Sequence, residues 1–337
     1  MARSTPSRPR QGSRAARARQ PSIEKLLIGD ALRSWVPPTV SVVVLCVMML
    51  LDAMELVPDR VAAAVGVVAL LLLGAFLIVS PLLADDADTQ VSPALAVAAG
   101  VLWIAILAYP FEARLFTGAP LGHVALDPSA KGSTIVPAGA ASEADVVVEA
   151  RLPLASDRRD RTVHYDVDLV DDGGAHARVE GELGDSWRMR RMGRRGTAPS
   201  HLEHLSESQV VAIGSGALHL ADVTLVGEPG ATAVATAYPH RLPPTAVLYG
   251  LAIVLCIGAL TLDRWWNPRA TATATMITTA ACAAALVFAT SGAGHPGVRD
   301  MIGAALVGAI AGVTIGTTAA WLVGRLVSRG GAARRAA

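Results

Sequence analysis

Six long apolar stretches run along the chain, three on each side of a polar segment at about 113–243. Each is close to the ~20 residues that a helix needs to cross the hydrocarbon core of a bilayer. The pattern therefore predicts a polytopic α-helical membrane protein with six transmembrane helices in a 3+3 arrangement around one inserted domain. The predicted spans are 38–57, 61–84, 93–111, 244–262, 271–290 and 301–323.

The polar insert has the alternating pattern of β-strands. In the segment from Thr162 to Val170, every second residue is apolar and the residues between are His or Asp, apart from Thr162 and Val170 at its ends. Such period-two alternation is typical of a strand with one buried face. Several short strands without helical periodicity predict an all-β domain, a small antiparallel sandwich or barrel. The other expected strands are 145–154, 177–183, 208–213, 217–226 and 231–238, with an arginine-rich loop at 186–200.

A turn signal, Asp171-Asp172-Gly173-Gly174, separates two of these strands. A two-residue loop would pair Leu169 with a polar residue. A three-residue loop, 172–174, pairs Leu169 with Ala177 and continues the match of apolar faces, and such loops usually need a glycine in the left-handed conformation. The sequence predicts the three-residue hairpin.

Charge is segregated along the chain and predicts its orientation. The first 33 residues hold eight basic and two acidic side chains. With the N-terminus inside, the cytoplasmic segments carry fourteen Lys and Arg residues and the two short external loops carry two, Arg60 and Arg299. By the positive-inside rule both termini are cytoplasmic and the insert is extracytoplasmic. Tryptophans near the inner ends of the spans agree with this orientation.

The ends of the chain differ from the spans in character. Residues 1–21 are expected to be a disordered basic cytoplasmic tail, 22–36 an amphipathic helix at the membrane interface, and 324–337 a second basic tail. The first tail is interpreted as a topology signal, with an anionic-lipid or nucleic-acid contact as the alternative. Abundant Ala, Gly and Arg with little Lys indicate a GC-rich bacterial genome, and hence the bacterial inner membrane.

An acidic stripe, Asp52, Glu55 and Asp59, lies at the outer end of the first span. A carboxylate within a membrane is a candidate for function, so these residues are candidates for an ion pathway. The competing interpretation is a structural ion pair with arginines expected at the same depth, Arg60, Arg114 and Arg299.

All eight histidines fall on the predicted outer side, which raises the hypothesis of a metal or pH-sensing site. His201 and His204 would share a face if they lay on a helix. The hairpin register places His164 opposite Glu182, beside further carboxylates that resemble a calcium ligand set. The same pattern is typical of a solvated sheet face. No cofactor is predicted, although a divalent metal is a possible ligand.

The last span carries small residues at every fourth position: Ala304, Gly308, Gly312, Gly316 and Ala320. This spacing lets two helices approach closely. It predicts tight packing against another helix, either within the chain or in a second copy.

Sequence motifs of the common enzyme classes are absent, including the Walker A loop, G-x-S-x-G, HExxH and a dinucleotide fingerprint. The sequence therefore favours a binding or assembly protein whose external β domain contacts a partner or an envelope ligand. A transport or channel component that uses the acidic stripe is the alternative, and a membrane-bound metal-dependent hydrolase or transferase is the third. Expected partners are the bilayer and a protein, or self-association through the last helix, and no nucleic acid.

Overall fold

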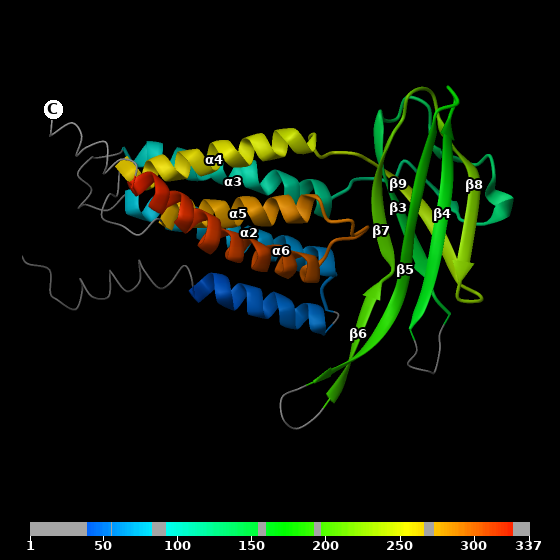
Figure 1. Cartoon of the computed structure of the whole chain (residues 1–337), viewed down its shortest axis with the longest axis horizontal. Coiled ribbons are helices and arrows are strands. Elements are labelled where there is room, and N and C mark those ends of the chain that lie inside the picture. The colour runs from blue at the N-terminus through cyan, green and yellow to red at the C-terminus, as the bar shows by residue number, and fades with distance from the viewer. Residues whose placement is uncertain are drawn as a thin grey trace, which may run out of the picture.

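The computed structural model of the chain describes residues 39–54, 56–82, 92–153, 160–191, 197–265 and 273–325. Helices gather at one end of the molecule and strands at the other (Figure 1). The chain forms three helices, then the strands, and then three further helices, in the order that the sequence predicts. The two expected tails and the interfacial helix 22–36 lie outside the described residues, apart from 324 and 325.

Six apolar helices form the bundle. They are Thr39–Ala53, α2 (Asp59–Leu82), α3 (Pro93–Leu115), α4 (Thr245–Trp265), α5 (Thr273–Ala289) and α6 (Val298–Ala311). A π-helical turn, η3 (Gly312–Gly316), continues α6, and helical backbone extends to Arg325. Among the described residues, four helices are long and apolar enough to cross a membrane: α2, α3, α4 and the α6–η3 helix.

The first helix is shorter than predicted. The expected span 38–57 ends as a helix at Ala53, and bends follow at Leu56 and Val57 before Pro58. Proline disfavours helical backbone in the residue before it, so Pro58 opposes a helix that continues to the predicted end at 57. The expected span 271–290 forms a helix over Thr273–Ala289, and residues 271 and 272 lie outside the described residues.

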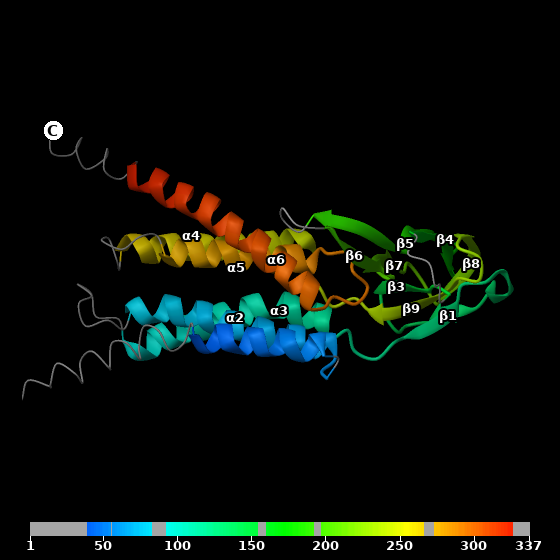
Figure 2. The same ribbon diagram turned by 90° about the horizontal axis from the view of Figure 1, so that it is seen from below.

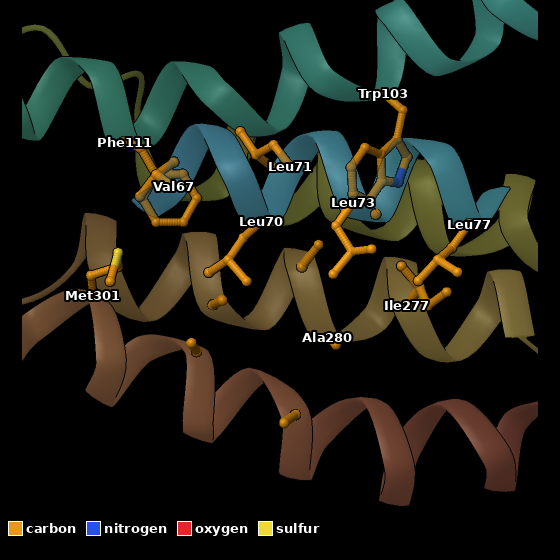
Figure 3. Close-up of a pocket in the computed structure, with 15 residues that line it drawn as sticks. Val67, Leu70, Leu71, Leu73, Leu77, Trp103, Phe111, Ile277, Ala280 and Met301 are labelled. Carbon is orange, nitrogen blue, oxygen red and sulfur yellow. The ribbon is translucent and has the colours of Figure 1, made fainter. Parts of the chain in front are cut away.

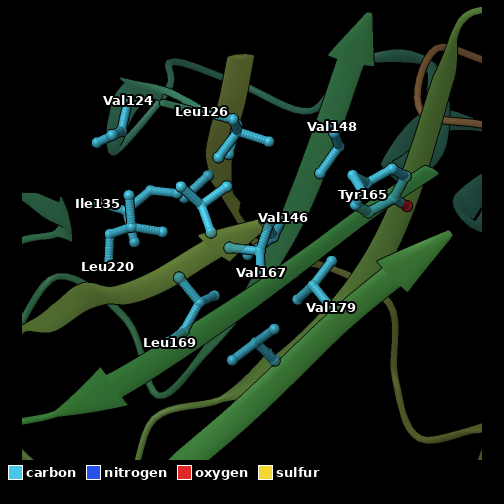
Figure 4. Close-up of a cluster of buried hydrophobic side chains, with 14 of the residues drawn as sticks. Val124, Leu126, Ile135, Val146, Val148, Tyr165, Val167, Leu169, Val179 and Leu220 are labelled. Carbon is cyan, nitrogen blue, oxygen red and sulfur yellow. The ribbon is translucent and has the colours of Figure 1, made fainter. Parts of the chain in front are cut away.

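The β domain consists of two antiparallel sheets. One has the order β1-β9-β3-β7 and the other β2-β8-β4-β5-β6. The strands are β1 (Gly122–Ala125), β2 (Thr134–Val136), β3 (Glu143–Arg151), β4 (Arg161–Asp171), β5 (His176–Arg191), β6 (Thr197–His204), β7 (Ser206–Ala212), β8 (Leu218–Gly227) and β9 (Thr232–Pro239). Apolar side chains from both sheets, among them Val146, Val167 and Leu220, form one core between them (Figure 4). The predicted antiparallel all-β domain is confirmed, as a sandwich.

The predicted hairpin register is confirmed. β4 and β5 pair Leu169 with Ala177, Val167 with Val179 and Val163 with Leu183. The Asp171 amide donates to the Ala175 carbonyl at 3.0 Å, which leaves 172–174 as the loop. Gly174 takes φ +81°, the left-handed conformation that this loop needs.

The expected loop at 186–200 is wrong over most of its length. β5 continues to Arg191 and β6 begins at Thr197, so the segment forms a two-stranded ribbon paired from Gly184–His204 to Arg191–Thr197. Its alternation of Trp187 and Met189 with arginines fits a strand, although the high charge suggested a loop. The short edge strands β1 and β2 were also not predicted, because three or four residues are too few to show a period.

The four-stranded sheet faces the helices and the five-stranded sheet lies beyond it (Figure 1). β3 is buried on both faces: Val146 and Val148 point into the sandwich, while Asp145 and Val147 are covered from the helical side. The α5–α6 loop covers Val147, because a Cβ placed on Gly294 would lie 2.6 Å from Val147 Cγ1. The same loop binds β7, where Gly292 accepts a hydrogen bond from the Ser208 amide at 2.8 Å. The outer face of the five-stranded sheet is therefore the face turned away from the bundle.

Candidate functional site

The outer face of the five-stranded sheet contains a shallow hollow of about 420 Å³. We call it the acidic hollow. Three central strands form it: β4 and β5, joined by the tight hairpin, and β8 on the other side of β4. Its lining residues are Asp166, Asp168, His176, Arg178, Asp222 and Thr224. Strand alternation turns these side chains outward, while their neighbours Val167 and Val179 are fully buried in the core.

Charged pairs organise the hollow. Arg178 binds Asp166 through two hydrogen bonds, Nε to Oδ1 at 2.7 Å and Nη2 to Oδ2 at 2.6 Å. This contact lowers the pKa of Asp166 below its ordinary value and raises the pKa of Arg178. His176 Nδ1 lies 3.0 Å from Asp168 Oδ2. Lys131 lies 2.7 Å from Asp222, and the hydrogen bond from Lys131 is the main cause that lowers the pKa of that carboxyl.

Among the side chains that the structure describes on this face, carboxylates exceed permanent cations. The carboxylates are Asp166, Asp168, Glu180, Glu182 and Asp222, and the permanent cations are Lys131 and Arg178. Cross-strand pairing aligns Asp166 with Glu180 and Asp168 with Asp222, so that like charges lie side by side. Adjacent like charges on a sheet are destabilising unless something positive lies beside them. The face is therefore suited to a cationic or hydrogen-bond-donating partner.

Two aspartates, Asp171 and Asp172, hold the hairpin end of this face in place through hydrogen bonds from backbone amides. Asp171 accepts hydrogen bonds from the backbone amides of Ala175, Gly214 and Ser215 at 2.8, 3.0 and 2.9 Å. These bonds, that of Ala175 first, hold the pKa of Asp171 below its ordinary value. Asp172 accepts from the Ala217 amide at 2.7 Å and contacts His219 at 2.9 Å, which also lowers its pKa.

The residues of the metal hypothesis are only partly brought together. His164 Nδ1 lies 3.7 Å from Glu182 Oε2, as the register predicted. His204 pairs with Gly184 in the next row of the same sheet. The segment of His201 and His204 is strand β6 rather than a helix, so a spacing of three does not place both on one face. No group of three or more potential metal ligands occurs in the described ranges.

The acidic stripe has one resolved role. Asp59 Oδ1 accepts a hydrogen bond from the Val298 amide at 2.7 Å, so this carboxylate caps the N-terminus of α6 from another helix. A negative charge is stabilised there by the helix dipole. Asp52 is partly buried near the end of the first helix, and Glu55 lies outside the described residues.

Arg114 joins the bundle to the β domain. Its side chain, 7% exposed at the end of α3, donates from Nη2 to the carbonyls of Ser291 and Ala293 at 2.7 and 2.6 Å. The same loop adds an antiparallel bridge to edge strand β7, between Ala293 and Glu207. His295 contacts Glu149 of β3. Sequence reasoning treated Arg114 only as a partner for the acidic stripe and did not identify this junction.

The small-residue stripe of the last helix lies against α5. A Cβ placed on Gly308 would lie 2.4 Å from the Ala280 carbonyl oxygen, and one on Gly312 would lie 2.6 Å from that of Met276. A Cβ on Gly316 would lie 2.9 Å from the Met276 Cα. Ala304 is buried and Ala320 is partly buried. The two backbones thus touch, with the partner helix in the same chain.

Comparison of the chain with family models, with curated proteins and with solved structures finds no match.

Proposed function

We propose that the chain is an integral membrane protein of the binding or assembly class, whose extracytoplasmic sandwich presents the acidic hollow to a cationic segment of a partner. All six helices would cross the bacterial inner membrane, with both termini in the cytoplasm. Arginine asymmetry supports this orientation. Large apolar side chains exposed on the helices, such as Leu72, Val254 and Ile310, support contact with lipid.

One observation carries the proposal: the sandwich is fixed to the bundle through its four-stranded sheet, so the five-stranded sheet points away from the bundle (Figure 1). Arg114 and the bridge from Ala293 to Glu207 hold this orientation. A charged surface held at a set height and angle is suited to recognition of a second protein, because electrostatic complementarity steers association and fixes its register.

The transport alternative receives less support from the geometry. Asp59 is engaged in capping α6, and the cavity within the bundle has an apolar lining. An ion pathway would require carboxylates or other polar groups along the translocation route.

A cysteine at Thr224 tests both the predicted extracytoplasmic location of the β domain and the acidic hollow as a binding site. Thr224→Cys should react in intact cells with a membrane-impermeant maleimide, because β8 faces the outside. The bulky adduct should then weaken binding of an oligolysine peptide to the purified full chain in detergent. Glu228→Cys, just beyond the end of β8 and not among the lining residues of the hollow, is the control that labels but keeps peptide binding.

Two results would contradict the proposal separately. Labelling of Thr224→Cys only after the cells are permeabilised would contradict the topology. Equal oligolysine binding by labelled and unlabelled Thr224→Cys would contradict the hollow as the binding site.

A further inference from the structure

A cavity of about 220 Å³ lies inside the helix bundle, between α2, α3, α5 and α6 (Figure 3). Hydrocarbon side chains dominate its wall, among them Leu70, Leu73, Leu77, Phe111 and Met301. The indole N–H of Trp103, which also lines it, is occupied by a hydrogen bond to Thr278 Oγ1 at 3.2 Å. The lining therefore suits an apolar ligand and offers little to a polar one.

The packing of α6 explains why the cavity exists. The glycines of α6 and η3 bring this helix onto the backbone of α5 at Ala280 and Met276. α6 consequently crosses away from α2 toward the end of the bundle distant from the sandwich (Figure 2). Near the sandwich the gap is closed, because Met301 of α6 packs onto Gly66 of α2, where an added Cβ would lie 2.5 Å from its sulfur.

The cavity has the length of a lipid chain segment in one leaflet. It extends along α2 from Val67 to Leu77, which corresponds to about 15 Å of helix and to about half of a bilayer's hydrocarbon thickness. Its volume exceeds the ~150 Å³ of an apolar protein cavity that holds benzene. Among the lining residues, Leu73, Leu77 and Ala305 are partly exposed and Ala309 is exposed, so the cavity opens to the surface of the bundle.

We propose that this cavity binds one hydrocarbon chain of a membrane lipid, and that it selects the chain rather than the headgroup. The inference rests on the membrane setting proposed above. A chain already in lipid gains no hydrophobic energy on entry, so its affinity comes from close packing against the fixed wall. A filled cavity also supplies the contacts that α2 and α6 do not make with each other.

A photoactivatable lipid tests the site. The full chain is reconstituted in vesicles of phosphatidylcholine or of phosphatidylglycerol that carry a diazirine in mid-chain, and adducts are mapped by mass spectrometry. We expect adducts at Leu73 and Leu77, in equal yield for the two headgroups. The double variant Ala305→Phe/Ala309→Phe fills the cavity from α6 and should lower that yield about tenfold, as expected for the loss of about ten van der Waals contacts.

Val307→Phe is the matched control, because Val307 lies on the same helix, is 46% exposed and does not line the cavity. It should leave the adducts at Leu73 unchanged. Undiminished labelling of Leu73 in the filled variant would overturn the proposal. Ile253 on the exposed surface of α4 reports the bilayer itself: its labelling with no adduct at Leu73 contradicts only the cavity, and its failure to label contradicts the membrane setting and both proposals.

Discussion

At the scale of single residues, the sandwich depends on carboxylates that serve backbone amides. Asp171 is 5% exposed and binds three amides from two loops, which ties the β4–β5 hairpin to the turn before β8. Because its pKa is lower in the folded protein than in the unfolded chain, this carboxylate stabilises the fold above the unfolded value of about 3.9. That contribution is lost as the pH falls through the folded pKa.

We therefore expect Asp171→Asn to lower the melting temperature of the purified chain by several degrees at pH 7. The side-chain NH₂ of asparagine would replace one carboxylate oxygen, and it cannot accept the hydrogen bonds that the backbone amides donate there. The difference from the wild type should shrink as the pH falls below about 4, because the unfolded chain then takes up a proton that the folded carboxyl, with its lowered pKa, takes up only at a lower pH. Thermal scans at pH 7 and pH 3 measure both effects. Asp222→Asn is the control: its exposed pair with Lys131 has little energetic value, so its melting temperature should hardly change. Equal losses in the two variants would refute the special role of Asp171.

At the scale of secondary-structure elements, the sequence predicted those features that produce a period in the order of apolar and polar residues. The β4–β5 register followed from matching the apolar faces and from one glycine, and it is the register observed. The ribbon of β5 and β6 was not predicted, because the high density of arginines at 186–200 was interpreted as a loop. The helix end at Ala53 was not predicted either, because hydropathy does not identify the turn that ends a helix.

The contact between α5 and α6 gives a prediction at the same scale. Gly312→Leu should destabilise the bundle by about 1–3 kcal/mol, the usual cost of overpacking, because its Cβ would lie 2.7 Å from that of Ala280. The expected result is a lower midpoint of thermal unfolding in detergent. Gly303→Leu on the same helix, where an added Cβ meets nothing within 4 Å, should be neutral or slightly stabilising. A neutral Gly312→Leu would show that the interface can separate freely.

At the scale of the whole molecule, the proposed function depends on how two units are joined, and the sequence alone could not show how they are joined. Alternation predicted the outward residues of β4 and β5, hence part of the acidic hollow. The third strand, β8, and the partner Lys131 come from distant segments that only the sheet order brings beside them. Likewise, the residues that contact Arg114 lie 177 and 179 positions further along the chain, beyond any local pattern.

The junction at Arg114 should therefore couple the motions of the sandwich to those of the bundle. Arg114→Met removes two charge-assisted hydrogen bonds while it keeps an apolar stem, and such bonds are each worth about 1.5–3 kcal/mol. We expect faster hydrogen exchange at the amides of Ser208 and Gly294, which bridge β7 and the α5–α6 loop, by about tenfold or more. Arg299→Met, a change of an exposed arginine in the first turn of α6, is the matched control and should leave this exchange unchanged. Hydrogen exchange like that of the wild type in both variants would contradict the role of Arg114. In that case the backbone pairing between the α5–α6 loop and β7 would fix the orientation of the acidic hollow.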